Sequence, residues 1–139
     1  MTHRRKTVRD AFASAVTGLG LTGARVYTSR LYPLAADEIP ALRIYTPSDT
    51  TDAETIGTSV VAPLRRIRIV CEAVAKANTA ADDSVDAICE QLEIKLATVP
   101  TLSGAVMKLA YLSFEQELNI ESDAPVVVGR MTFEAIAAS

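Results

Sequence analysis

The stretch that decides the fold is RRIRIVCEAVA, residues 65–75. Arginine and isoleucine alternate in its first half, which is the period of a β-strand with one buried face. The side chains expected on the buried face are those of Ile67, Ile69, Cys71 and Ala73. The opposite face carries Arg66, Arg68, Val70, Glu72 and Val74. The pattern therefore predicts a strand that lays one face on a hydrophobic core.

Two other segments have the spacing of amphipathic helices. One follows the strand, with Asn78 or Thr79 as its expected N-cap and Pro100 as its end. Asp82, Asp83 and Asp86 suit its positive N-terminus, and its apolar stripe consists of Val85, Ile88, Cys89, Leu92, Leu96 and Val99. The other helix is expected over residues 4–17, with a stripe formed by Val8, Ala11, Phe12, Ala15, Val16 and Leu19.

Further strands are expected at residues 25–30, 41–46, 107–118 and 126–136. The apolar phase of residues 107–118 slips between Tyr111 and Leu112, which predicts a β-bulge. Residues 47–63 are rich in Ser, Thr, Asp and Gly. They predict a long loop or a hairpin arm, because connections of this length are uncommon in compact domains.

This order of elements predicts an α+β fold in a single domain, residues 1–139. It is a two-layer sandwich, in which two amphipathic helices cover one face of a mainly antiparallel or mixed β-sheet of about five strands. The other sheet face is expected to be polar and to meet water or a partner, since it carries Arg66, Arg68, Arg130, Thr132 and Glu134.

Composition narrows the class of protein. The chain has 139 residues, of which 49% are hydrophobic, so one domain with a true core is expected. A net charge of −3 argues against a general nucleic-acid binder. Cys71 and Cys89 fall on apolar faces and are expected to be buried, reduced thiols. No apolar run has the length of a membrane span, so we expect a soluble protein made in a reducing cytoplasm.

Residues that carry chemistry are scarce. His3 is the only histidine and lies close to the N-terminus, where a solvated side chain is expected. No glycine-rich phosphate loop or hydrolase motif occurs. The acidic group Asp82, Asp83 and Asp86 is already explained by the helix dipole. The sequence therefore predicts no catalytic residue, no metal and no cofactor, and a protein that is not an enzyme.

The residues that suggest an interaction are basic. Arg66 and Arg68 project from one strand face, and arginine is favoured in interfaces because it binds carboxylates in a bidentate manner. A solvated polar face is the alternative. The candidate oligomer or partner interface consists of Arg65, Arg66, Arg68 and Arg130, with Asp49, Thr50, Asp52 and Glu54 from the long loop.

A run between the first expected helix and the strand at 65–75 carries a family resemblance. Residues 30–34 read RLYPL, an acidic turn follows at Asp37 and Glu38, and residues 39–45 read IPALRIY. This run resembles the matching region of bacteriophage tail terminator proteins, the minor tail protein U family. The resemblance continues through the basic strand at 65–74, the helix led by Asp82 and Asp83, and the strand 128–133.

The resemblance implies a structural virion protein of the tail, made in the cytoplasm of a bacterial host. Members of the family close into a ring, commonly a homohexamer, that caps the tail tube and ends its polymerisation. The implied partners are the chain itself, the tail tube protein and a head-completion or connector protein. A membrane is not implied.

Three other functions fit parts of the sequence. Another head–tail connector or neck completion protein would have a similar size. A nucleic-acid-binding α+β module would use Arg66, Arg68 and Arg130 on an open sheet, although such sheets usually present aromatic residues for stacking. A small enzyme with an unrecognised site is the third, and the shortage of catalytic residue types argues against it.

Overall fold

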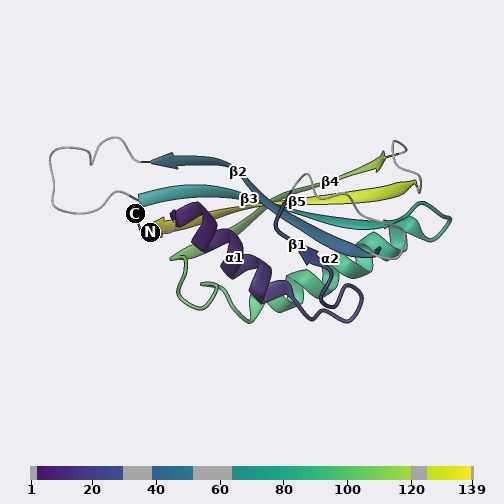
Figure 1. The fold of residues 1–139 in the computed structure, drawn as a ribbon, viewed down its shortest axis with the longest axis horizontal. Helices are drawn as coiled ribbons and strands as arrows, with labels where there is room; N and C mark the ends of the chain where they lie inside the picture. Colours follow the sequence, from purple (N-terminus) through teal and green to yellow (C-terminus); the bar gives the residue numbers. More distant parts are fainter. Residues whose placement is uncertain (1–2, 30–38, 52–63, 120–124, 139) are drawn as a thin grey trace, which may run out of the picture.

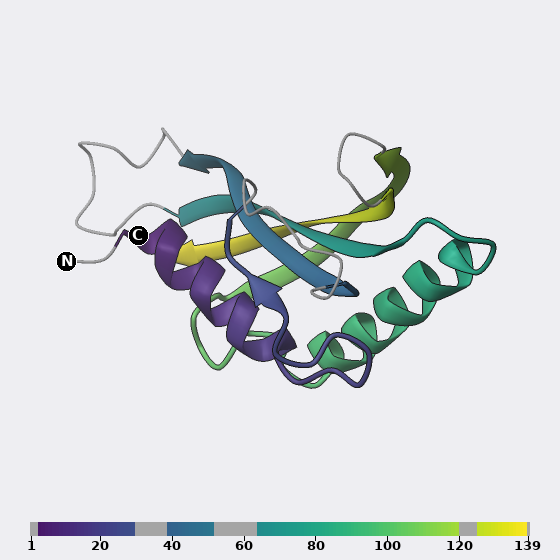
Figure 2. The same ribbon diagram turned by 45° about the vertical axis from the view of Figure 1, so that its right-hand side comes forward.

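The computed structural model describes residues 3–29, 39–51, 64–119 and 125–138. The elements, in chain order, are α1 (Arg4–Val16), β1 (Val26–Tyr27), β2 (Ala41–Thr51), β3 (Leu64–Lys76), α2 (Ala81–Ala97), β4 (Lys108–Asn119) and β5 (Val126–Ala138). The strands form one open sheet in the order β1-β2-β3-β5-β4. β1 is parallel to β2, and the other neighbours are antiparallel. Both helices lie on one side of the sheet (Figures 1 and 2), so the predicted α+β fold is confirmed.

The alternation in residues 65–75 has the predicted consequence. Ile67, Ile69, Cys71 and Ala73 are fully buried against the helices. α1 contributes Val8, Phe12 and Val16 to the same core, and α2 contributes Ala81, Val85, Ile88, Cys89, Leu92 and Leu96. The rings of Phe12 and Phe133 lie 5.2 Å apart, which joins α1 to β5. Each large side chain of this kind contributes roughly 1.5–3 kcal/mol by leaving water.

Strand lengths differ from the sequence-based expectation. β1 has only two residues, and β2 continues to Thr51, past the expected end at residue 46. Residues 47–51 were expected in the long loop or hairpin arm. Residues 48–51 pair with β3, with Thr51 opposite Arg65, which agrees with the hairpin alternative for these residues and not with a loop. Cross-strand pairing thus extends β2 where the local composition favours a loop. Residues 52–63 of that segment, and the Tyr32-Pro33-Leu34 run, lie outside the described residues.

The start of α2 differs from the expectation in one detail. Its N-cap is Ala80, which has no capping side chain, so neither Asn78 nor Thr79 is the N-cap. The side chain of Asn78 instead accepts a hydrogen bond of 2.9 Å from the Ala80 amide, in the turn that precedes the helix. Asp82 and Asp83 occupy the first helical turn as expected. They provide negative charge at the positive helix end, in place of a side-chain cap.

The sheet face away from the helices, called the outer face here, is only partly polar. Ile39, Val74, Val126 and Val128 form a second buried apolar cluster at one end of it. The expectation of a polar face was therefore wrong for this half. Arg66, Arg68 and Glu134 occupy the other end, so the face is divided between a basic end and an apolar end.

Bulges occur in both long outer strands of the sheet. The register of β4 against β5 shifts between Tyr111 and Ser113, which confirms the predicted bulge. A second shift, not predicted, lies in β2 between Tyr45 and Ser48. Both shifts lie on the row of the sheet where Ile69 of β3 is opposite Phe133 of β5.

Candidate functional site

The predicted interface residues fall into two groups. Asp49 and Thr50 lie at the end of β2, beside Arg65, Arg66 and Arg68 at the start of β3. Arg130 lies on β5, farther along the sheet and opposite Glu72. Asp52 and Glu54 lie outside the described residues. The structure therefore brings five of the predicted residues together and places the sixth in a separate cluster.

Two of these five residues, Asp49 and Arg65, bind each other, and Asp49 also binds α1. The Asp49 carboxylate is almost fully buried and forms ion pairs with Arg65 and with Arg5 of α1, the latter at 3.2 Å. These contacts fasten the first turn of α1 to the strand pair β2–β3. We therefore assign Asp49 and Arg65 to the stability of this end of the sheet, which leaves Arg66 and Arg68 as its exposed cations.

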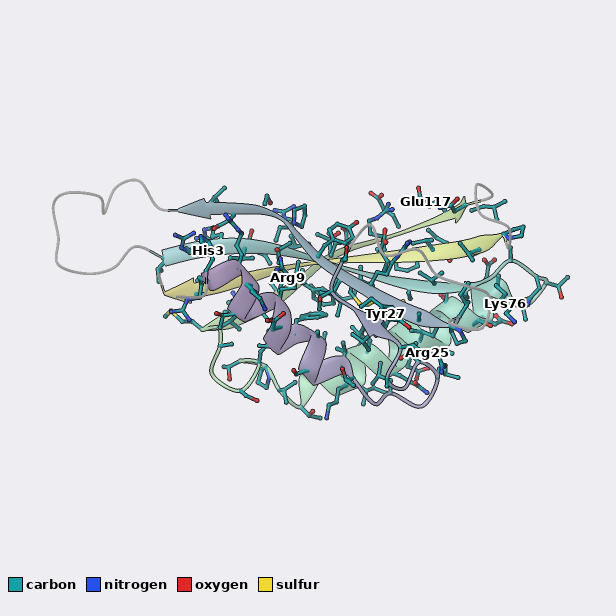
Figure 3. All side chains as sticks on the ribbon, in the orientation of Figure 1. His3, Arg9, Arg25, Tyr27, Lys76 and Glu117 are labelled. Atoms are coloured by element: carbon teal, nitrogen blue, oxygen red, sulfur yellow. The ribbon has the colours of Figure 1, made fainter. Side chains whose placement is uncertain are left out.

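Arg66 and Arg68 share one carboxylate. Their guanidinium groups lie 3.3 Å and 3.6 Å from the two oxygens of Glu134, and their side chains are 50% and 45% exposed. One charge of the pair is therefore left without a matching acid in this cluster. Arg4, Arg5 and Lys6 of α1 lie at the same end of the molecule, where Figure 3 labels His3. This group is called the basic end below.

A row of alternating charge crosses the sheet on its outer face. Arg43, Glu72, Arg130 and Glu115 follow one another in register on β2, β3, β5 and β4. Glu72, only 3% exposed, accepts from Arg43 at 3.1 Å and from Arg130 at 3.0 Å. The Tyr45 hydroxyl adds a hydrogen bond of 3.3 Å to Glu72. Within this charge row, ion pairs join β2, β3 and β5 in one internal network.

Arg130 is therefore less available to a partner than its sequence position suggested. Its guanidinium also donates to Glu117 at 2.7 Å. The hydrogen bond to Glu117, followed by that to Glu72, raises the pKa of Arg130 above its usual value. Charge-assisted bonds of this kind hold the side chain against the sheet.

Sequence reasoning missed the outer edge of β4. Strand β4 is the last strand of the sheet, and nine of its twelve residues are exposed although several of them are apolar. The large exposed ones are Tyr111, Leu112, Phe114 and Leu118. Only β5 pairs with β4 among the described residues, so main-chain groups along its other side lack a strand partner there. The signal in the sequence was the apolar residues on both sides of the phase slip.

Groups with catalytic potential are used structurally. His3 is exposed as expected, and its Nδ1 accepts from the Arg5 amide at 3.0 Å, which makes it the N-cap of α1. The Asp82 carboxylate accepts a hydrogen bond from Gln116 of β4. The described residues contain no group of three or more His, Cys, Asp or Glu side chains placed to hold a metal ion. Within the same residues, no helix has the length and hydropathy needed to cross a membrane.

The two cysteines are free and buried, as predicted. Burial, with smaller contributions from Glu93 and Asp86, raises the pKa of Cys89 from 9.0 to about 11. Burial raises the pKa of Cys71 further still. A thiol becomes reactive only as the thiolate, so neither is a candidate nucleophile.

These thiols predict a loss of stability at alkaline pH. An unfolded cysteine ionises from about pH 9, whereas the folded thiols stay protonated, so the unfolded state binds fewer protons above that pH. The free energy of unfolding should fall by about 1 kcal/mol per thiol between pH 8 and pH 10. Urea unfolding at both pH values measures this. The Cys89→Ala variant should show a smaller fall, and an equal fall would contradict the explanation.

Comparisons with known proteins give a likeness of fold and no family. No protein-family model matches the sequence, and a search of curated proteins gives no match. Among solved structures, the fold is similar to a chain described as the virion of a native gene transfer agent (GTA) particle. The TM-score is 0.47 and the sequence identity 13%, over 98% of this chain and 92% of that chain. The likeness concerns the arrangement of the backbone.

Proposed function

We propose that this chain is a structural protein of a phage-type virion. In this proposal it forms a homo-oligomeric ring, of about six copies by the family resemblance, that caps the tail tube. The ring ends tube polymerisation and gives the head-completion protein a surface to bind. The proposal joins the sequence resemblance to tail terminators with the observed two-layer fold. The observation that carries it is the long apolar edge of β4, which a monomer leaves exposed to water.

The surfaces of the molecule suit this role. A heterologous contact closes into a ring when its rotation divides a full turn. Such a contact needs two different patches on one subunit. The β4 edge and the basic end differ in chemistry and lie in different parts of the sheet. The basic end also offers cations for a carboxylate-bearing partner.

Tube assembly in vitro tests this function. The tail tube protein of the same virus is polymerised with and without the purified chain, and tube lengths are measured by electron microscopy. We expect shorter tubes with a ring at one end. Tubes of unchanged length, together with capture of a head protein only, would replace this function by that of a neck completion protein.

Charge reversal on the basic end should weaken assembly. Arg66→Glu places a carboxylate beside Glu134, while Arg66 is half exposed, so its ion pair contributes at most about 1 kcal/mol to folding. We expect the mass from light scattering to fall at micromolar concentration while the melting temperature changes little. Arg68→Glu should act in the same direction.

Lys76→Glu is the matched control for both variants. It makes the same charge change on the same strand, but at the far end of β3. It should leave the measured mass unchanged. If all three variants have the same light-scattering mass as the wild type, the basic end has no part in the oligomer.

A further inference from the structure

We propose that β4 of one copy pairs with β2 of the next, so that one continuous sheet passes from subunit to subunit. The inference rests on the ring form proposed above and names the contact that closes it. Strands β4 and β2 are both open to a further strand. β4 has a neighbour on one side only, and beyond Arg43 so does β2, among the described residues.

Strand direction permits this contact. β2, β3, β5 and β4 alternate in direction, since each neighbouring pair is antiparallel. Two copies placed side by side in the same orientation therefore bring β4 against an antiparallel β2. The helices of both copies then stay on the same side of the joined sheet. A repeated contact of this kind is heterologous, as a ring requires.

The two bulges match each other. One row of the sheet contains Ser48, Arg68, Glu134 and Ala110, and another contains Tyr45, Val70, Thr132 and Ser113. Between these rows, β3 and β5 contribute one residue each, Ile69 and Phe133. Strand β2 contributes two, Thr46 and Pro47, and β4 also contributes two, Tyr111 and Leu112. Each outer strand is thus longer than its inner neighbour by the same amount and in the same place.

This coincidence fixes a register. A regular strand cannot keep a continuous register with a bulged edge strand, because two residues of the bulged strand lie opposite one residue of its partner. β4 and β2 can keep a continuous register with each other, since each carries one extra residue at the same row of the sheet. Continuing the rows places Ala110 opposite Ser48 and Ser113 opposite Tyr45 of the next copy. Pro47 then lies in the bulge, where proline is tolerated in a paired strand.

Charge supports a second copy as the occupant. β1 covers β2 at Leu42 and Arg43, so the new pairing runs over residues 45–50 of β2 and 108–113 of β4. Beyond it, β4 carries the acids Glu115 and Glu117. The β1 side of the sheet carries the bases Arg25 and Arg43. The acidic edge of one copy therefore approaches the basic edge of the next.

Cysteine crosslinking of the full chain tests the register. Ser48→Cys and Ala110→Cys are prepared separately, mixed at high micromolar concentration and oxidised. Directly opposite residues of an antiparallel pair lie close enough for a disulfide after small adjustment. We expect a crosslinked dimer in the mixture and none with either variant alone. Cys71 and Cys89 do not interfere, because they are buried.

Thr50→Cys mixed with Ala110→Cys is the matched control. Its two positions are diagonal in the proposed register and lie farther apart. Crosslinking in this mixture should be severalfold slower. Equal rates in the two mixtures, no crosslink in either, or a crosslink with Ala110→Cys alone would each overturn the proposed contact.

These outcomes are separate from the tube assay. A chain that shortens tubes but gives no crosslink overturns this contact and leaves the capping function in place. A chain that crosslinks as expected but leaves tube length unchanged keeps the contact and loses the capping function.

Discussion

Replacement of Glu72 by alanine should lower the free energy of unfolding by about 3–5 kcal/mol, the range for breaking a buried ion pair. Glu72 is almost completely buried. Its carboxylate forms ion pairs with Arg43 and Arg130 and accepts a hydrogen bond from the Tyr45 hydroxyl. Without its carboxylate, two guanidinium groups remain close together on a largely covered surface. Their mutual repulsion and lost hydrogen bonds both oppose folding.

Urea unfolding followed by circular dichroism measures this effect. Glu117→Ala is the matched control, because Glu117 binds the same arginine but its side chain is 56% exposed. That variant should lose less than about 1 kcal/mol. If the two variants lose the same amount, the buried carboxylate has no special part in joining the strands. Glu72→Gln separates charge from shape and should fall between Glu72→Ala and the wild type.

The Gly129→Ala variant is expected to lose about 3 kcal/mol, the upper end of the usual range for an overpacked core. A Cβ at this position would lie 2.4 Å from the Val85 Cγ1 atom and 3.0 Å from the Phe114 ring. Val85 is fully buried on α2, and valine in a helix has one strongly preferred χ1 rotamer. Admitting one methyl group therefore requires either an unfavourable Val85 rotamer or a shift of α2 relative to the sheet, and both oppose folding.

A double variant identifies the contact. Val85→Ala removes the atom that collides, so Gly129→Ala combined with Val85→Ala should be more stable than the sum of the single effects predicts. Gly20→Ala provides the control, because its Cβ would lie no closer than 3.4 Å to its nearest neighbour, the Gln91 side chain, which is an ordinary van der Waals contact. Thermal unfolding of the wild type, the two single variants at Gly129 and Val85, and the double variant measures the coupling between the two positions. Simple additivity would mean that the helix adjusts without strain.

The sequence predicted those features that depend on local periodicity. The alternation around Ile67 and Ile69 gave the central strand, and the stripes on residues 4–17 and 79–99 gave both helices. The sequence did not predict which residues lie opposite one another on neighbouring strands. Nothing local indicates that Glu72 is opposite Arg130, since that depends on the register of strands far apart in sequence. Pairing with β3 likewise carried β2 into a stretch whose composition favours a loop.

The candidate site was predicted in part for the same reason. Exposure of Arg66 and Arg68 followed from strand alternation. The roles of Asp49 and Arg65 did not, because their partner Arg5 comes from a distant helix. The open edge of β4 depends on strand order, which one sequence does not specify. The phase slip in residues 107–118 predicted the bulge of β4, but it did not predict that β4 lies at the edge of the sheet.

The paired irregularities of β2 and β4 have a consequence for the behaviour of the protein before assembly. An exposed strand edge ordinarily invites any extended chain to add to it and so promotes fibrils. In the proposed contact the bulge in β4 selects its partner strand. A regular strand, or β2 shifted by two residues, would lose hydrogen bonds at the bulge. On the proposed contact, the exposed β4 edge therefore favours a second copy of this chain over an unrelated extended strand.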